Sequence, residues 1–203
     1  MTNIGLRKRS KKGCISARSD SRRIGRACAA IIFYTFFSQA FSLNGESMEY
    51  PVKIAFLYNF AKFVEWPPVA YRSPGAPLTI CIVGHDPFSP EIEAEVRSKS
   101  VSGHPIEILT LKPTDLLRLC HMVFIPVTEK DQADKIVRGL NGASTLTVGE
   151  AAGFAMMGGM INFTLEGSKV HFEINRAAAD GVRLKISSKL LSLAKIVAES
   201  GRQ

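Results

Sequence analysis

At 203 residues, 46% of them hydrophobic, the chain is long enough for one domain with a substantial core. Its net charge of +8 is unevenly spread, because residues 1–40 hold nine lysines and arginines and one acid, which leaves 17 basic and 17 acidic residues in 41–203. A neutral body excludes broad electrostatic attraction to a phosphate backbone, so we expect no nucleic-acid partner.

The first forty residues have the order of a secretory signal peptide. A basic stretch ends at Arg26, an apolar run covers 27–37, and Ser38-Gln39-Ala40 places small residues before a cut after Ala40. The apolar run is too short for a bilayer-spanning helix, which needs about 20 residues. We therefore expect a periplasmic protein of residues 41–203 that does not insert into the membrane. The alternative is a segment that is kept as an uncleaved anchor.

Residues 41–203 alternate between helical and strand patterns. An amphipathic helix is predicted over 50–66, with Lys53 on its polar side and Pro67-Pro68 after its end. Four apolar runs predict buried strands, at 78–83, 106–111, 121–127 and 144–148. A polar segment follows each of the first three runs, and these segments predict helices at 90–98, 114–119 and 128–140. This order predicts a single α/β domain, a three-layer sandwich with a mainly parallel sheet and flanking helices.

The pattern changes after Glu150. A loop rich in glycine and methionine, 153–159, precedes two alternating runs, 160–165 and 169–174, which predict an antiparallel hairpin. A terminal helix is predicted from Ser187 through Ala198.

Two features of this part are candidate partner contacts. Phe154, Met156 and Met157 either close the end of the sheet or form an adaptable apolar surface for a partner. In the second strand of the hairpin, alternation places Glu173 on the face opposite Phe172, where it would be exposed to a partner.

Catalytic and metal-binding motifs are missing from the sequence. The four histidines do not have the spacing of a metal site, and no G-x-G-x-x-G follows the first predicted strand. We therefore expect no enzymatic activity, no catalytic or metal-binding residue and no cofactor. Gly84, His85 and Asp86 follow the first strand at its carboxyl end, where doubly wound sheets bind ligands. They predict a ligand crevice, with an ordinary polar turn as the alternative.

Two of the four cysteines, Cys14 and Cys28, belong to the predicted signal peptide. Cys81 and Cys120 remain, in a compartment that favours disulfides. A bridge would close a loop of about 40 residues and stabilise the fold by about 4 kcal/mol. Two buried free thiols are the alternative.

Two long segments stand out, V-K-I-A-F-L-Y-N-F-A-K-F-V-E-W-P at 52–67 and I-S-S-K-L-L-S-L-A-K at 186–195, with shorter ones at 78–84, 158–163 and 172–175. Together these segments resemble the YfiR family of small periplasmic proteins. The resemblance implies an α/β sandwich in which Cys81 and Cys120 match one of the family's disulfide positions. A second pair, found in some relatives around the loop and hairpin after Gly153, is absent here, so the resemblance gives no ground for expecting redox control.

The resemblance also implies a function. Characterised members bind the periplasmic sensor domain of a membrane-anchored diguanylate cyclase and hold it inactive, which lowers cyclic di-GMP and biofilm formation. By analogy the chain would form a homodimer. The alternative is a periplasmic protein that binds or senses a small ligand, with the crevice at Gly84, His85 and Asp86 as its site.

Overall fold

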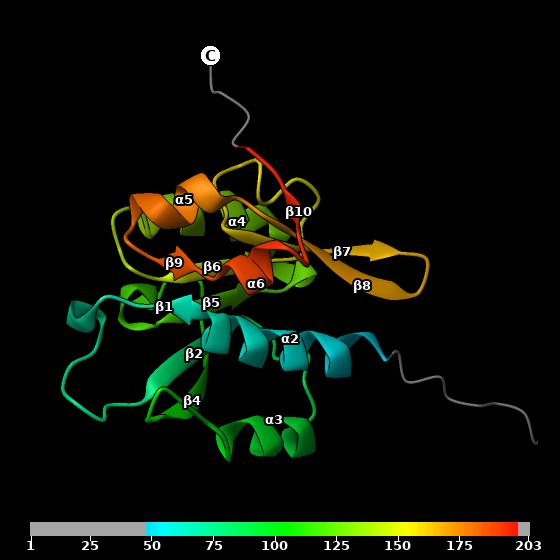
Figure 1. The fold of residues 1–203 in the computed structure, drawn as a ribbon. Helices are drawn as coiled ribbons and strands as arrows, with labels where there is room; N and C mark the ends of the chain where they lie inside the picture. The colour runs from blue at the N-terminus through cyan, green and yellow to red at the C-terminus, as the bar shows by residue number, and fades with distance from the viewer. Residues whose placement is uncertain (1–47, 199–203) are drawn as a thin grey trace, which may run out of the picture. The chain divides into compact units, whose positions relative to one another are not determined.

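The computed structural model describes residues 48–198, so the predicted signal peptide and its cut lie outside the described residues. Its centre is an eight-stranded sheet with the order β10-β8-β7-β6-β5-β2-β4-β3 (Figure 1). Its strands are β2 (Leu78–Val83), β3 (Ser100–Val101), β4 (His104–Leu111), β5 (Met122–Ile125), β6 (Leu146–Gly149), β7 (Ile161–Glu166), β8 (Lys169–Ile174) and β10 (Lys195–Ile196). Strands β4, β2, β5, β6 and β7 run parallel, and β7 and β8 form the predicted antiparallel hairpin.

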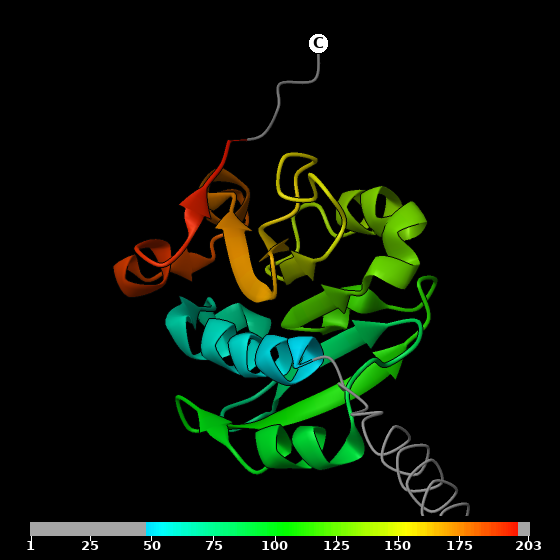
Figure 2. The same ribbon diagram turned by 90° about the vertical axis from the view of Figure 1, so that its right-hand side faces the viewer.

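Helices cover both faces of this sheet. They are α2 (Glu49–Phe63), α3 (Pro90–Arg97), α4 (Lys130–Gly139), α5 (Arg176–Gly181) and α6 (Ser188–Leu191). Successive side chains of β2 point to opposite faces of the sheet and pack in two different cores. Ile80 packs in the core that includes α2, whereas Cys81 packs in the core that includes α4. In Figure 2, α2 and α4 lie on opposite sides of the strands. The predicted mainly parallel α/β sandwich is therefore confirmed.

Helix α2 ends near the predicted point, but its buried face differs from the prediction. Ile54, Leu57 and Phe60 are buried, and so is Lys53, which is only 3% exposed. The prediction of Lys53 on the polar side is therefore wrong. The physical reason is the presence of carboxylate partners inside the fold, as described below. After α2, β1 (Val64–Glu65) pairs antiparallel with β9 (Lys185–Ile186).

Two predicted helices are shorter than expected. The segment 114–119 contains only the 3-10 turn η2 (Leu117–Leu119), and the terminal helix stops after the single turn of α6. The chain then forms β10, which pairs in parallel with β8. An open sheet edge offers backbone partners that the helical pattern of the sequence does not reveal, so the edge decides the conformation.

Candidate functional site

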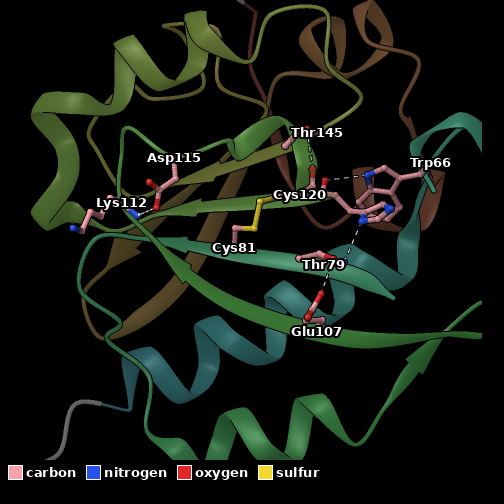
Figure 3. Close-up of a disulfide and its surroundings, with 9 residues drawn as sticks. Trp66, Thr79, Cys81, Glu107, Lys112, Asp115, Cys120 and Thr145 are labelled. Atoms are coloured by element: carbon pink, nitrogen blue, oxygen red, sulfur yellow. Dashed lines mark hydrogen bonds between the residues drawn. A yellow bond between two sulfur atoms is a disulfide. The ribbon is translucent and has the colours of Figure 1, made fainter. Parts of the chain in front are cut away.

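The disulfide joins Cys81 of β2 to Cys120, which lies just before His121 and the start of β5. Cys81 and Cys120 are both buried, their Cα atoms are 6.0 Å apart, and their sulfurs are bonded (Figure 3). The hydroxyl of Thr145 donates a hydrogen bond of 2.9 Å to the backbone oxygen of Cys120. The bridge therefore holds the β4–β5 connection against the sheet. This connection contains the short turn η2 and no α-helix.

His121, next to the bridge, is buried and neutral. Its Nδ1 accepts a hydrogen bond of 3.1 Å from the backbone N–H of Thr79, and its backbone oxygen accepts one of 3.0 Å from Trp66 Nε1. Within residues 48–198, Nε2 has no hydrogen-bond partner. Burial, followed by the nearby His104, lowers the pKa of His121 to about 4, against a smaller opposing effect of the Ala70 carbonyl.

The predicted crevice residues lie at the carboxyl end of β2. Gly84 has a φ of +76°, a conformation that favours glycine, and a Cβ on it would come within 2.2 Å of Glu129 Oε1, which would have to move. Asp86 accepts hydrogen bonds from the Phe88 backbone N–H, at 2.9 Å, and from the Thr110 hydroxyl, at 3.2 Å. These contacts are those of a polar turn. A ligand at this position stays a prediction.

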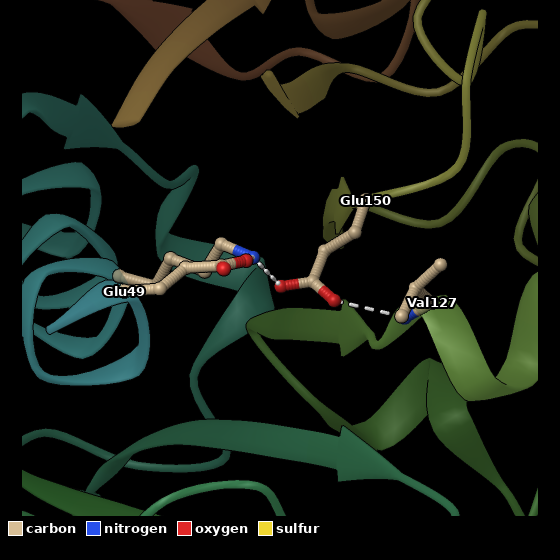
Figure 4. Close-up of polar contacts among 4 residues, drawn as sticks. Glu49, Val127 and Glu150 are labelled. Atoms are coloured by element: carbon tan, nitrogen blue, oxygen red, sulfur yellow. Dashed lines mark hydrogen bonds and ion pairs between the residues drawn. The ribbon is translucent and has the colours of Figure 1, made fainter. Parts of the chain in front are cut away.

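The carboxyl ends of β5 and β6 are tied to α2 by a buried ion pair. Glu150, just after β6, pairs with Lys53, which also pairs with Glu49 one turn earlier (Figure 4). The other Glu150 oxygen accepts a hydrogen bond of 2.8 Å from the Val127 backbone N–H. Burial alone would lower the pKa of Lys53, but the bonds to Glu150 and Glu49 outweigh it, so the pKa is raised and the lysine stays charged.

This ion pair was not predicted, although Lys53 and Glu150 are both visible in the sequence. They are 97 residues apart, and no local pattern connects them. Within residues 48–198, no three His, Cys, Asp or Glu side chains come together as metal ligands.

The loop after Glu150 is built around Phe154. Its side chain is 1% exposed and lies against Gly149 and Gly159, where added Cβ atoms would come within 2.7 and 2.2 Å of its ring. Phe154 therefore fills the end of the core and is not accessible to a partner in this conformation. Of its two predicted roles, Phe154 has the first, which is to close the end of the sheet.

Met156 and Met157, at the outside of the same loop, are 43% and 37% exposed. Met157 borders a hollow of about 550 Å³ between α4 and α5. We call this hollow the methionine groove; its apolar lining includes Val137, Leu140, Met157, Met160, Ala177, Ala178 and Val182.

Buried Asn175 links the loop 153–159 to helix α5. Its Nδ2 donates to the Ala155 backbone oxygen at 2.9 Å, and its Oδ1 accepts from the Ala178 backbone N–H at 3.0 Å, which caps α5. The Asn175 side chain thus joins the loop 153–159 to helix α5. Asparagine followed by Arg-Ala-Ala-Ala is a helix-start signal, so α5 could have been found from the sequence.

Glu173 lies away from these methionines and is largely buried, which corrects its predicted exposure. One carboxylate oxygen pairs with Lys195 of β10 at 2.9 Å. The face was assigned correctly, since Phe172 packs against the rings of α2 on the other side. Strand β10 covers Glu173, and β10 itself was not predicted.

No helix within residues 48–198 combines the length and apolar character that crossing a membrane requires. A search of curated proteins found none that matches the chain. A comparison with protein families matches residues 50–195 to the YfiR/HmsC-like family, whose members are periplasmic regulators of cyclic di-GMP signalling. The match covers nearly all of the sheet and its helices, and it agrees with the resemblance seen in the sequence. The chain therefore belongs to the YfiR/HmsC-like family.

Proposed function

We propose that this protein binds the periplasmic domain of an inner-membrane diguanylate cyclase and holds that enzyme inactive, which lowers cyclic di-GMP and restrains biofilm formation. The proposal rests on membership in a family of periplasmic cyclic di-GMP regulators. The single structural observation that supports a contact site is the pair of exposed methionines beside the methionine groove.

The loop 153–159 has the properties of a surface that binds another protein. Its base is rigid, because Phe154 is packed in the core and Asn175 holds the Ala155 carbonyl. Its outer side chains, Met156 and Met157, are unbranched thioethers, which adapt their shape to a partner surface. An apolar segment of the cyclase domain that enters the groove would bury these side chains together with the groove lining.

The test is a double variant, Met156→Asp with Met157→Asp, in the exported protein. We expect at least a tenfold loss of affinity for the purified periplasmic domain of the partner cyclase, measured by calorimetry, because two carboxylates would be desolvated at an apolar contact. Cyclic di-GMP in cells that carry the variant should rise to the level of a deletion strain. The free energy of unfolding should change by less than about 1 kcal/mol, since both side chains are at the surface.

A matched control is Leu165→Asp, which places the same charge on an exposed leucine of the hairpin. This variant should bind like the unaltered protein. If no periplasmic cyclase domain binds the unaltered protein and deletion leaves cyclic di-GMP unchanged, the proposed function fails. If the double variant binds normally, the function stands and the contact lies elsewhere.

A further inference from the structure

Helix α4 packs on one face of the sheet, but within residues 48–198 no helix covers this face over β4. The β2–β4 crossover contains α3 and the β5–β6 crossover contains α4, whereas the β4–β5 connection contains only the turn η2. Pairing with β2 places Glu107, Leu109 and Leu111 on the same face as Cys81, which is the α4 face. No helix within residues 48–198 takes the place above them that a regular doubly wound sheet would fill.

A hollow of about 840 Å³ occupies this place, and we call it the leucine groove. Its lining includes β4 residues, Cys120 of the disulfide, and the segments around Tyr71, η2 and Ser144. Leu116 and Leu119, on the η2 segment, are 75% and 54% exposed. Four leucines line the groove: Leu109, Leu111, Leu116 and Leu119. The size is that of a site for a small molecule.

The arginines of the described residues divide into two sets. Arg97, Arg138 and Arg176 each pair with an acid one helical turn away. The other three have no ion-pair partner within residues 48–198, and every one of them lines the leucine groove: Arg72, Arg118 and Arg183. Within residues 48–198, the one side-chain hydrogen bond of these three arginines joins Arg118 Nη2 to the Asn141 backbone oxygen at 3.0 Å.

Two carboxylates also line the groove, but each is engaged locally. Glu107 accepts a hydrogen bond of 3.2 Å from the Thr79 hydroxyl, and Asp115 accepts one of 2.8 Å from the Lys112 backbone N–H. The groove therefore combines an apolar wall with three guanidinium groups that lack a carboxylate partner. Guanidinium groups bind carboxylates and phosphates with two parallel hydrogen bonds.

We propose that the leucine groove binds an amphiphilic anion, a molecule with an apolar chain that ends in a carboxylate or phosphate. The chain lies against the leucines, and the anionic end pairs with the arginines at the rim. A free fatty acid and a single phospholipid share this chemistry. A concave site of this volume favours one enclosed molecule over a flat membrane surface. The inference goes beyond the proposed function, and the leucine and methionine grooves share no lining residue.

The test uses dodecanoate below its micellar concentration, added to the purified mature protein. Trp66, the only tryptophan of the chain, reports binding because its ring donates to the backbone oxygen of His121, which lines the groove. We expect a saturable change in its fluorescence, with calorimetry giving one site. Dodecyltrimethylammonium, which has the same chain and the opposite charge, and acetate, which lacks the chain, should bind at least tenfold more weakly.

The variant is the triple substitution Arg72→Gln, Arg118→Gln and Arg183→Gln, which removes the charges and keeps polar side chains of similar reach. It should weaken dodecanoate binding at least tenfold, since charge-assisted hydrogen bonds are the strong ones. The matched control, Arg138→Gln with Arg176→Gln, removes two ion-paired arginines and should bind dodecanoate normally. The triple variant should still bind the cyclase domain, which keeps this test separate from that of the proposed function.

Equal binding of the anionic and cationic amphiphiles, or an unchanged affinity in the triple variant, would overturn the proposal. Lysophosphatidylglycerol below its micellar concentration distinguishes a phosphate from a carboxylate head, and binding of either supports it. Sedimentation with phosphatidylglycerol vesicles without binding of either monomer would instead identify a membrane-docking surface and refute a single-molecule site.

Discussion

A buried basic side chain lies at each end of the parallel strands, and the two side chains have pKa shifts of opposite direction. At the carboxyl ends, Lys53 is buried between Glu49 and Glu150, and its pKa is raised. At the amino ends, His121 is buried without a carboxylate partner, and its pKa is lowered to about 4. Burial penalises charge at both ends, so the presence or absence of a carboxylate partner decides whether the basic group stays charged.

The ends also differ in how they are closed. Helix α2 reaches the carboxyl ends and holds them through an ion pair and the aromatic contact of Tyr50 with Phe88. The amino ends border the leucine groove, where the disulfide and the turn η2 stand in place of a helix. A covalent bond thus supplies stability that helix packing supplies elsewhere.

The largest expected effect comes from removing that bond. The double variant Cys81→Ala with Cys120→Ala should lower the free energy of unfolding by about 4 kcal/mol, because the unfolded chain is no longer constrained by its loop. Urea denaturation of the oxidised protein and of the variant measures this difference. Adding a reductant should destabilise the unaltered protein and leave the variant unaffected. A loss below about 1 kcal/mol would show that packing alone holds the β4–β5 connection.

At the other end, Lys53→Met should destabilise the protein by about 3 kcal/mol, because Glu150 would remain buried without a countercharge. Adding Glu150→Gln should restore part of the loss, since no unpaired charge then stays buried. Chemical denaturation of the three proteins gives the coupling energy of the pair. Lys62→Met, at an exposed position of the same helix, is the control and should change stability by less than about 0.5 kcal/mol. Additive losses would contradict a specific pairing.

The smallest effect is the pH response of His121. Its folded pKa of about 4 lies below the unfolded value near 6.5, so the stability it contributes is complete above pH 6.5 and is lost as the pH falls from 6.5 through 4. The loss should be about 1–2 kcal/mol, less than the full shift implies, because the ring lies beside an open groove where solvent screens its charge. Melting temperatures between pH 7 and pH 4 measure it. His121→Gln should flatten this pH dependence, whereas His104→Gln should reduce it only in part, because burial is the larger cause of the shift.

Elements whose patterns are local could be predicted from the amino-acid sequence. The apolar run at 78–83 became β2 with the predicted bounds, and the hairpin of β7 and β8 formed across the predicted turn. Alternation and helical periodicity arise from which face of a single element is buried, so they survive whatever the element packs against. The same holds for membership in the YfiR/HmsC-like family, which long continuous segments indicate.

Features that depend on residues far apart in the chain could not be predicted before the fold was known. Lys53 is buried because Glu150 meets it, Glu173 is covered because β10 pairs beside it, and Phe154 is enclosed because Gly149 and Gly159 leave room for its ring. The leucine groove exists because one crossover lacks a helix, and its three arginines come from segments that the fold alone brings together. Long-range partners override local preference, since the free energy of a buried group depends on what surrounds it.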